Sequence, residues 1–269
     1  MSEHTIWLAF GLTTIAGLST GIGSLIALIA KRTNTKFLCA SLGFSAGVML
    51  YVSFMDLLPE AKEELVLHLG EKAGTLCLLL SFFGGMGLIT LIDFVIPKIN
   101  NPHEFLGVED MKNPDSRQKE LHRMGIFVAL SIAAHNFPEG IAAFTSAMSS
   151  GLSVAIPITV AIAIHNIPEG IAVSVPIFHA TGNKRKAFWL SFLSGLAEPV
   201  GALVAWFFLM PFWSPLIHGI VLAAVAGIMV YIALDELLPT AEKYGEHHIS
   251  ISGLIAGMIL MALSLFLFI

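Results

Sequence analysis

The sequence predicts an all-α integral membrane protein with eight transmembrane helices. Its 269 residues are 56% hydrophobic and only 12% charged, whereas soluble proteins carry about 25% charged residues. The apolar residues gather in stretches of about 20, the length that crosses a bilayer as a helix. Polar and turn-forming residues separate these stretches. A water-soluble monomer of this size has no interior large enough to hide so much apolar surface, so we expect lipid to be its solvent.

Eight stretches are predicted to span the bilayer, and they are residues 6–29, 37–58, 74–97, 123–147, 152–178, 187–209, 214–238 and 250–269. One break, residues 59–72, opens with Pro59. The longest break is a loop at about 98–122, with two prolines, mixed charges and almost no periodicity. This composition is typical of a mobile segment. We treat residues 1–269 as a single transmembrane domain.

The distribution of basic residues predicts the orientation of the spans. Twelve of the 14 Lys and Arg residues fall in the breaks after the first, third, fifth and seventh spans. Cytoplasmic loops carry such an excess of positive charge. We therefore expect both termini to be extracytoplasmic and the loop at about 98–122 to be cytoplasmic.

An internal repeat relates the second span to the seventh. Residues 46–51 (AGVMLY) match residues 226–231 (AGIMVY), and residues 56–59 (DLLP) match residues 236–239 (ELLP). The offset is 180 residues in both cases, and the two spans run in opposite directions. We predict an inverted repeat of spans 1–3 and 6–8 around a central antiparallel pair, spans 4 and 5. Many secondary transporters share this plan, with the binding site near the membrane midplane.

A second repeat places polar residues inside the central pair of spans. The hexapeptide HNFPEG at residues 135–140 returns as HNIPEG at residues 165–170. Helical residues turn by about 100° each, so the glutamate of each copy lies between its histidine and its asparagine on one face. A carboxylate at the bilayer centre costs about 3 kcal/mol or more, which a bound cation would offset. Two facing copies predict two adjacent cation sites bridged by Glu139 and Glu169.

The motif also predicts local geometry and the class of metal. Pro138 and Pro168 have no backbone N–H and should bend their helices, which frees a carbonyl one turn back. Gly140 and Gly170 should allow neighbouring helices to approach closely. Imidazole combined with carboxylate favours zinc, iron(II), manganese or cobalt. A third intramembrane carboxylate, Glu198, is a candidate ligand on the asparagine side of the centre. Helix packing alone would also account for buried polar residues, and the duplication of the whole motif argues against it.

Further acids lie near the ends of the predicted spans. Asp56 is near the outer end of the second span, and Asp235 and Glu236 are near the inner end of the seventh. Charged rims raise the local concentration of cations, so these acids are candidates for metal entry and exit. An ordinary interfacial role for these carboxylates fits their positions equally well. His218 is assigned no role.

The paired motifs and the segment GLAEP at residues 195–199 resemble the ZIP family of divalent metal transporters, most closely its bacterial zinc transporters. The resemblance covers essentially the whole chain. It implies uptake of zinc, with iron, manganese and cobalt as further substrates, across a bacterial inner membrane. It also implies a binuclear site. The ligands implied for the first metal are His135, Glu139, His165 and Glu169. Those implied for the second are Asn136, Asn166, Glu139, Glu169 and Glu198.

The alternative function is an intramembrane zinc metallohydrolase. Zinc proteases place a glutamate general base directly after the first histidine of HExxH. Asn136 and Asn166 occupy that place here, and an amide cannot accept the proton. We therefore expect a transporter and not an enzyme, with the metal as its cargo and no resident cofactor. The expected partners are divalent metal ions and the lipid bilayer, without nucleic acid. The sequence leaves open whether the chain is a carrier or a channel and whether it forms a homodimer.

Overall fold

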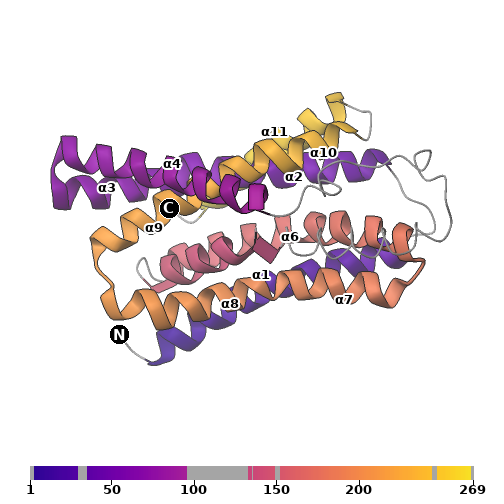
Figure 1. Ribbon diagram of the computed structural model, residues 1–269, viewed down its shortest axis with the longest axis horizontal. Helices are drawn as coiled ribbons and strands as arrows, with labels where there is room; N and C mark the ends of the chain where they lie inside the picture. Colours follow the sequence, from indigo (N-terminus) through magenta and orange to yellow (C-terminus); the bar gives the residue numbers. More distant parts are fainter. Residues whose placement is uncertain are drawn as a thin grey trace.

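The structure, a computed structural model, describes residues 3–29, 35–95, 133–134, 136–148, 152–243 and 247–267, and all of their regular structure is helical (Figure 1). The helices are α1 (Glu3–Ile29), α2 (Thr35–Val52), α3 (Leu58–Leu69), α4 (Glu71–Val95), α6 (Leu152–Thr181), α7 (Lys184–Gly195), α8 (Ala197–Val204), α9 (Pro215–Ile232), α10 (Leu238–Lys243) and α11 (His247–Leu267). Residues 136–148 form a further helix. The predicted cytoplasmic loop at about 98–122 lies outside the described residues.

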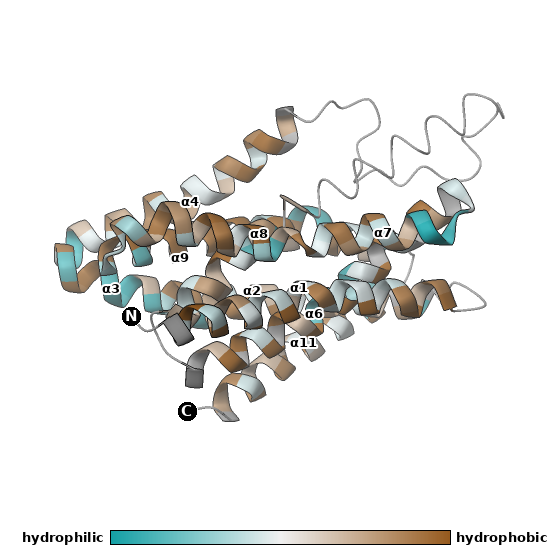
Figure 2. Ribbon diagram, turned by 90° about the horizontal axis from the view of Figure 1, so that it is seen from below, coloured by the Kyte–Doolittle hydropathy of each residue, from teal (hydrophilic) through white to brown (hydrophobic). Residues whose placement is uncertain are grey.

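The helices are long and apolar enough for a membrane protein. Six of the described helical stretches, 20 to 31 residues long, are candidate membrane spans by length and hydropathy. Large apolar side chains face outward, among them Leu80 on α4 (67% exposed) and Phe266 on α11 (71% exposed). Hydrophilic residues gather on α3 and at the start of α7, toward opposite ends of the helices (Figure 2). Outward apolar surface on this scale marks a protein that contacts lipid.

The predicted break at residues 59–72 is wrong for most of its length. The helix continues from α2 through the π-helical turn η1 (Ser53–Leu57) into α3, and it ends only at Gly70. Pro59 lies in the first turn of α3, where a missing backbone N–H leaves no hydrogen bond unmade. Gly70 has φ 80°, a left-handed conformation that favours glycine, and it turns the chain into α4.

Three π-helical turns interrupt the α-helices among the described residues. They are η1, η3 (Ala205–Leu209, after α8) and η5 (Ala233–Leu237, between α9 and α10). Two of them, η1 and η5, are separated by 180 residues, the offset of the longer sequence repeat. Each contains acidic residues: Asp56 in η1, and Asp235 and Glu236 in η5. Isolated π turns of this kind occur often at functional sites.

Close helix crossings position α6 at the centre of the fold. It packs extensively against α1 and also contacts α2 and α7. Gly170 on α6 meets the backbone of Thr20 on α1, and Gly23 on α1 meets the backbone of Ile167 on α6. On the helix 136–148, Gly140 abuts the backbone of Glu198 on α8. Glycines at these crossings remove the side chains that would otherwise hold the motif-bearing helices away from their neighbours.

Candidate metal centre

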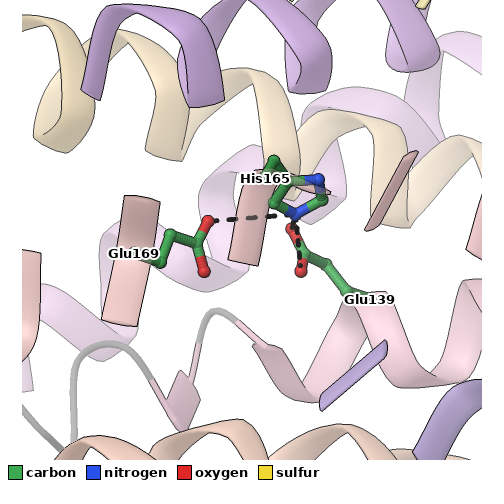
Figure 3. Close-up of side chains that lie close together, drawn as sticks. All are labelled: Glu139, His165 and Glu169. Atoms are coloured by element: carbon green, nitrogen blue, oxygen red, sulfur yellow. Dashed lines mark hydrogen bonds and ion pairs between the residues drawn. The ribbon is translucent and has the colours of Figure 1, made fainter. Parts of the chain in front are cut away.

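Three ligand-type side chains from the two motifs converge inside the protein (Figure 3). Glu139 comes from the helix 136–148, while His165 and Glu169 come from α6. Nε2 of His165 lies 3.3 and 3.2 Å from the two carboxylate oxygens of Glu139. The same nitrogen lies 3.9 Å from Oε1 of Glu169, one helical turn further along α6. One ligand atom from each of the three residues lies within 4.8 Å of the others.

The three side chains are almost fully removed from solvent. His165, Glu139 and Glu169 are each 1% exposed. Burying charged groups this deeply costs several kcal/mol each unless a partner compensates. The ligand set, one imidazole and two carboxylates, is one that zinc and related transition metals accept. This cluster can therefore hold a divalent cation.

Ser45 on α2 supports the cluster from a third helix. Its hydroxyl donates a hydrogen bond to Oε1 of Glu169, with an O···O distance of 3.3 Å. Sequence reasoning missed this residue, because a lone serine in an apolar span carries no distinguishing signal. Ser45 directly precedes the repeated AGVMLY segment, which is the nearest signal in the sequence.

Replacing Ser45 by alanine should weaken metal binding at the cluster by about tenfold, because hydrogen bonds to ligating carboxylates tune metal affinity at this scale. Metal titration of the purified protein measures the effect. Ser53→Ala is the matched control, since the buried Ser53 hydroxyl has no hydrogen-bond partner. Equal affinities in the two variants would contradict the supporting role of Ser45.

A second group of polar side chains lies on the asparagine side of the motifs. Asn166 donates hydrogen bonds from Nδ2 to the carbonyl of Ala16, at 3.0 Å, and to Oε1 of Glu198. Asn136 donates from Nδ2 to the carbonyl of Ser194, at 3.4 Å. Oδ1 of Asn166 and Oε2 of Glu198 are buried without a hydrogen-bond partner. Such orphaned oxygens are rare in protein interiors and are suited to coordinate a cation.

The electrostatics of the centre also call for a cation. Glu198 is fully buried, and Glu139 and Glu169 lie close enough to repel its charge. Adjacent carboxylates without positive partners disfavour one another's ionised forms. A divalent ion among the three would replace this repulsion by attraction.

The structure thus brings together six of the seven candidate ligands named from the sequence, in two adjoining groups. The seventh, His135, lies outside the described residues. Helix α6 is continuous through Pro168, so the freed carbonyl expected from that proline stays a prediction. The other expected metal-binding acids, Asp56 and Glu236, lie in the π turns η1 and η5. The Oδ2 atom of Asp56 is buried without a hydrogen-bond partner.

Comparisons with known proteins agree with this arrangement. Residues 105–265 match the protein family described as "ZIP Zinc transporter". A Clostridium perfringens protein named zinc transporter ZupT is 57% identical over 279 residues, covering 99% of this chain and 98% of the relative. The proteins of that name from Streptococcus mutans and Lysinibacillus sphaericus are 56% and 59% identical. Their alignments cover 100% and 98% of this chain, and 100% and 99% of the relatives.

Proposed function

This chain belongs to the ZIP family of zinc transporters, and we propose that it carries zinc into the bacterial cytoplasm through a binuclear site between the helix 136–148 and α6. The observation that carries the proposal is the buried convergence of Glu139, His165 and Glu169. Its full-length relatives, which are named zinc transporters, support zinc as the cargo. Because members of this family are transporters and not enzymes, the metallohydrolase alternative is set aside.

The first zinc ion would be held by the cluster of Glu139, His165 and Glu169, with His135 as the expected fourth ligand. The second would be held on the asparagine side, with the two glutamates shared between the ions. The orphaned oxygens of Asn166 and Glu198 support this second position. Iron(II), manganese and cobalt accept the same ligand types, so we include them as substrates.

The π turns support the inverted repeat that the mechanism requires. The turn η1, which follows α2, contacts α9, while η5, which follows α9, contacts α2. A pseudo-two-fold axis relating α2 to α9 would produce this reciprocal packing. The partner helices agree, because Gly47 on α2 meets α11 and its repeat equivalent, Gly227 on α9, meets α4. In this arrangement the metal centre lies near the axis, where inverted-repeat transporters bind their substrates.

The charge distribution supports inward transport. Lys184, Arg185 and Lys186 lie at the start of α7, at the opposite end of the bundle from α3 (Figure 1). We assign the α7 end to the cytoplasm by the positive-inside rule, which leaves both termini outside and the membrane as the bacterial inner membrane. Zinc would enter past Asp56 and leave past Glu236. Protons compete with zinc for histidine and carboxylate ligands, so ligand protonation would assist release.

Replacing Glu169 by alanine should reduce zinc uptake to the background of cells without the transporter. The substitution removes a ligand of the first ion and a bridge to the second. Radiolabelled zinc uptake by cells that express each variant at equal membrane levels measures the effect. The matched control is Glu63→Ala, which removes an exposed carboxylate on α3. Wild-type uptake in Glu169→Ala would overturn the assignment of the site.

A further inference from the structure

A second histidine–carboxylate cluster lies outside the central site, where α9 meets α3. His218 on α9 has a side chain that is only 2% exposed. Its Nε2 lies 4.0 Å from Oε1 of Glu60, and its Nδ1 lies 3.8 Å from Oε1 of Glu64. The two glutamates are one helical turn apart on α3, and their side chains are 25% and 29% exposed. The imidazole thus faces one carboxylate at each nitrogen, and both carboxylates reach solvent.

Local structure fixes the imidazole in this position. Ser214 caps the start of α9, where its side chain accepts a hydrogen bond from the N–H of Ile217 at 3.2 Å. The backbone N–H of His218 donates to the carbonyl of Ser214 at 2.9 Å. The ring of Trp213 covers the imidazole, with centroids 5.1 Å apart. Gly219 lets α9 approach the backbone of α3 closely.

The cluster is built for a ligand that the protein itself does not supply. Although His218 is buried, its Nε2 has no hydrogen-bond partner, which is costly for a polar atom away from water. Both N···O separations are too long for hydrogen bonds. Metal-bound histidines commonly offer one nitrogen to the ion and donate the other N–H to a carboxylate, which orients the ring. Nε2 with Glu60 fits the first role, and Nδ1 with Glu64 fits the second.

We infer that His218 and Glu60 form a loading site for a divalent transition metal at the extracytoplasmic end of the transporter, with Glu64 orienting the imidazole. Two protein ligands and water suit an ion that must be handed on, because a closed four-ligand site is typical of a retained structural metal. This inference rests on the proposed function for its direction and its cargo. The binding site itself does not depend on transport.

The position of the cluster fits delivery toward the centre. Charged residues crowd positions 60–64 of α3, which places this stretch at the membrane surface and not in hydrocarbon. Asp56, with its unpaired buried oxygen, precedes Glu60 by four residues on the same continuous helix. Ser45, which contacts Glu169, lies a further 11 residues back, or about 16 Å at 1.5 Å per residue. A metal released from His218 therefore meets acidic or hydroxyl oxygens along α2 before it reaches the centre.

Zinc titration of purified full-length protein in nanodiscs tests the inference. All variants carry Glu169→Ala, which disables the central site, and zinc chloride is the only ligand. Adding His218→Asn or Glu60→Gln should each remove one class of weakly bound zinc. Adding Glu63→Gln, which neutralises an exposed acid on the same helix, should remove none. If the His218 and Glu60 variants bind as much zinc as the Glu63 variant, the inference is overturned.

Two further readouts separate a loading role from a purely structural role of the cluster. With Glu169 intact, Glu60→Gln should raise the KM for zinc several-fold and leave kcat unchanged. A purely structural role for His218 would lower the melting temperature of the His218 variant and leave zinc binding in Glu60→Gln unaltered, which would contradict the inference. If the chain transported no zinc while His218→Asn still removed bound metal, the proposed function would fail and the loading site would stand.

Discussion

Zinc uptake by Glu139→Gln is expected to fall by about 100- to 1,000-fold, the largest loss expected for any single ligand. Removing one partner of a buried charged group costs about 3–5 kcal/mol, and every 1.4 kcal/mol is a factor of about ten in binding. Glu139 is the residue whose two oxygens both lie within 3.3 Å of the His165 imidazole. In the proposed binuclear site it also contributes to the second ion, so its loss weakens both positions.

Glu198→Gln is the informative comparison for Glu139→Gln. Glu198 contacts Asn166 and belongs only to the proposed second position. Equilibrium zinc binding to the purified protein should therefore fall from two ions to one in Glu198→Gln, while Glu139→Gln loses tight binding of both. Glutamine keeps the side-chain volume and removes the charge, so helix packing is preserved. If the two variants lose the same number of ions, Glu139 does not bridge the metals.

The sequence predicts the membrane class and the central cluster because both depend on local patterns. Apolar stretches of bilayer length need no knowledge of tertiary structure, and the repeated hexapeptide fixes the helical spacing of His165 and Glu169. Pro59 shows the limit of such patterns. Proline usually ends a helix, but in this chain it lies in a first turn prepared by a π turn. A π turn depends on tertiary packing, and no residue type announces it.

Contacts between distant segments are the other feature that patterns cannot supply. Ser45 reaches Glu169 across 124 residues, and His218 faces two acids more than 150 residues earlier in the chain. A single serine or histidine in an apolar stretch carries no signal of its partner. Only the packing of α2 on α6, and of α9 on α3, reveals these roles. The acids of η1 and η5 are an intermediate case, because the repeat at offset 180 related them before their surroundings were known.

Gly170→Ala should both destabilise the protein and abolish uptake, although alanine is the better helix former. A Cβ at Gly170 would overlap the backbone of Thr20 on α1, and backbone cannot move aside as a side-chain tip can. Overpacking of this kind costs about 1–3 kcal/mol, and helix α6 must shift to relieve it. Because Glu169 adjoins Gly170, that shift also displaces a metal ligand. Catalytic and binding groups tolerate displacements of only about 0.5 Å.

Gly84→Ala is the matched control for Gly170→Ala. Gly84 also lies within a helix, α4, but a Cβ there would meet no atom within 4 Å. The gain in helix propensity, about 1 kcal/mol, should then leave this variant at least as stable as the wild type. Thermal unfolding in detergent and zinc uptake, measured side by side, separate the two cases. If Gly170→Ala melts and transports like Gly84→Ala, the α1–α6 crossing does not hold the metal centre in place.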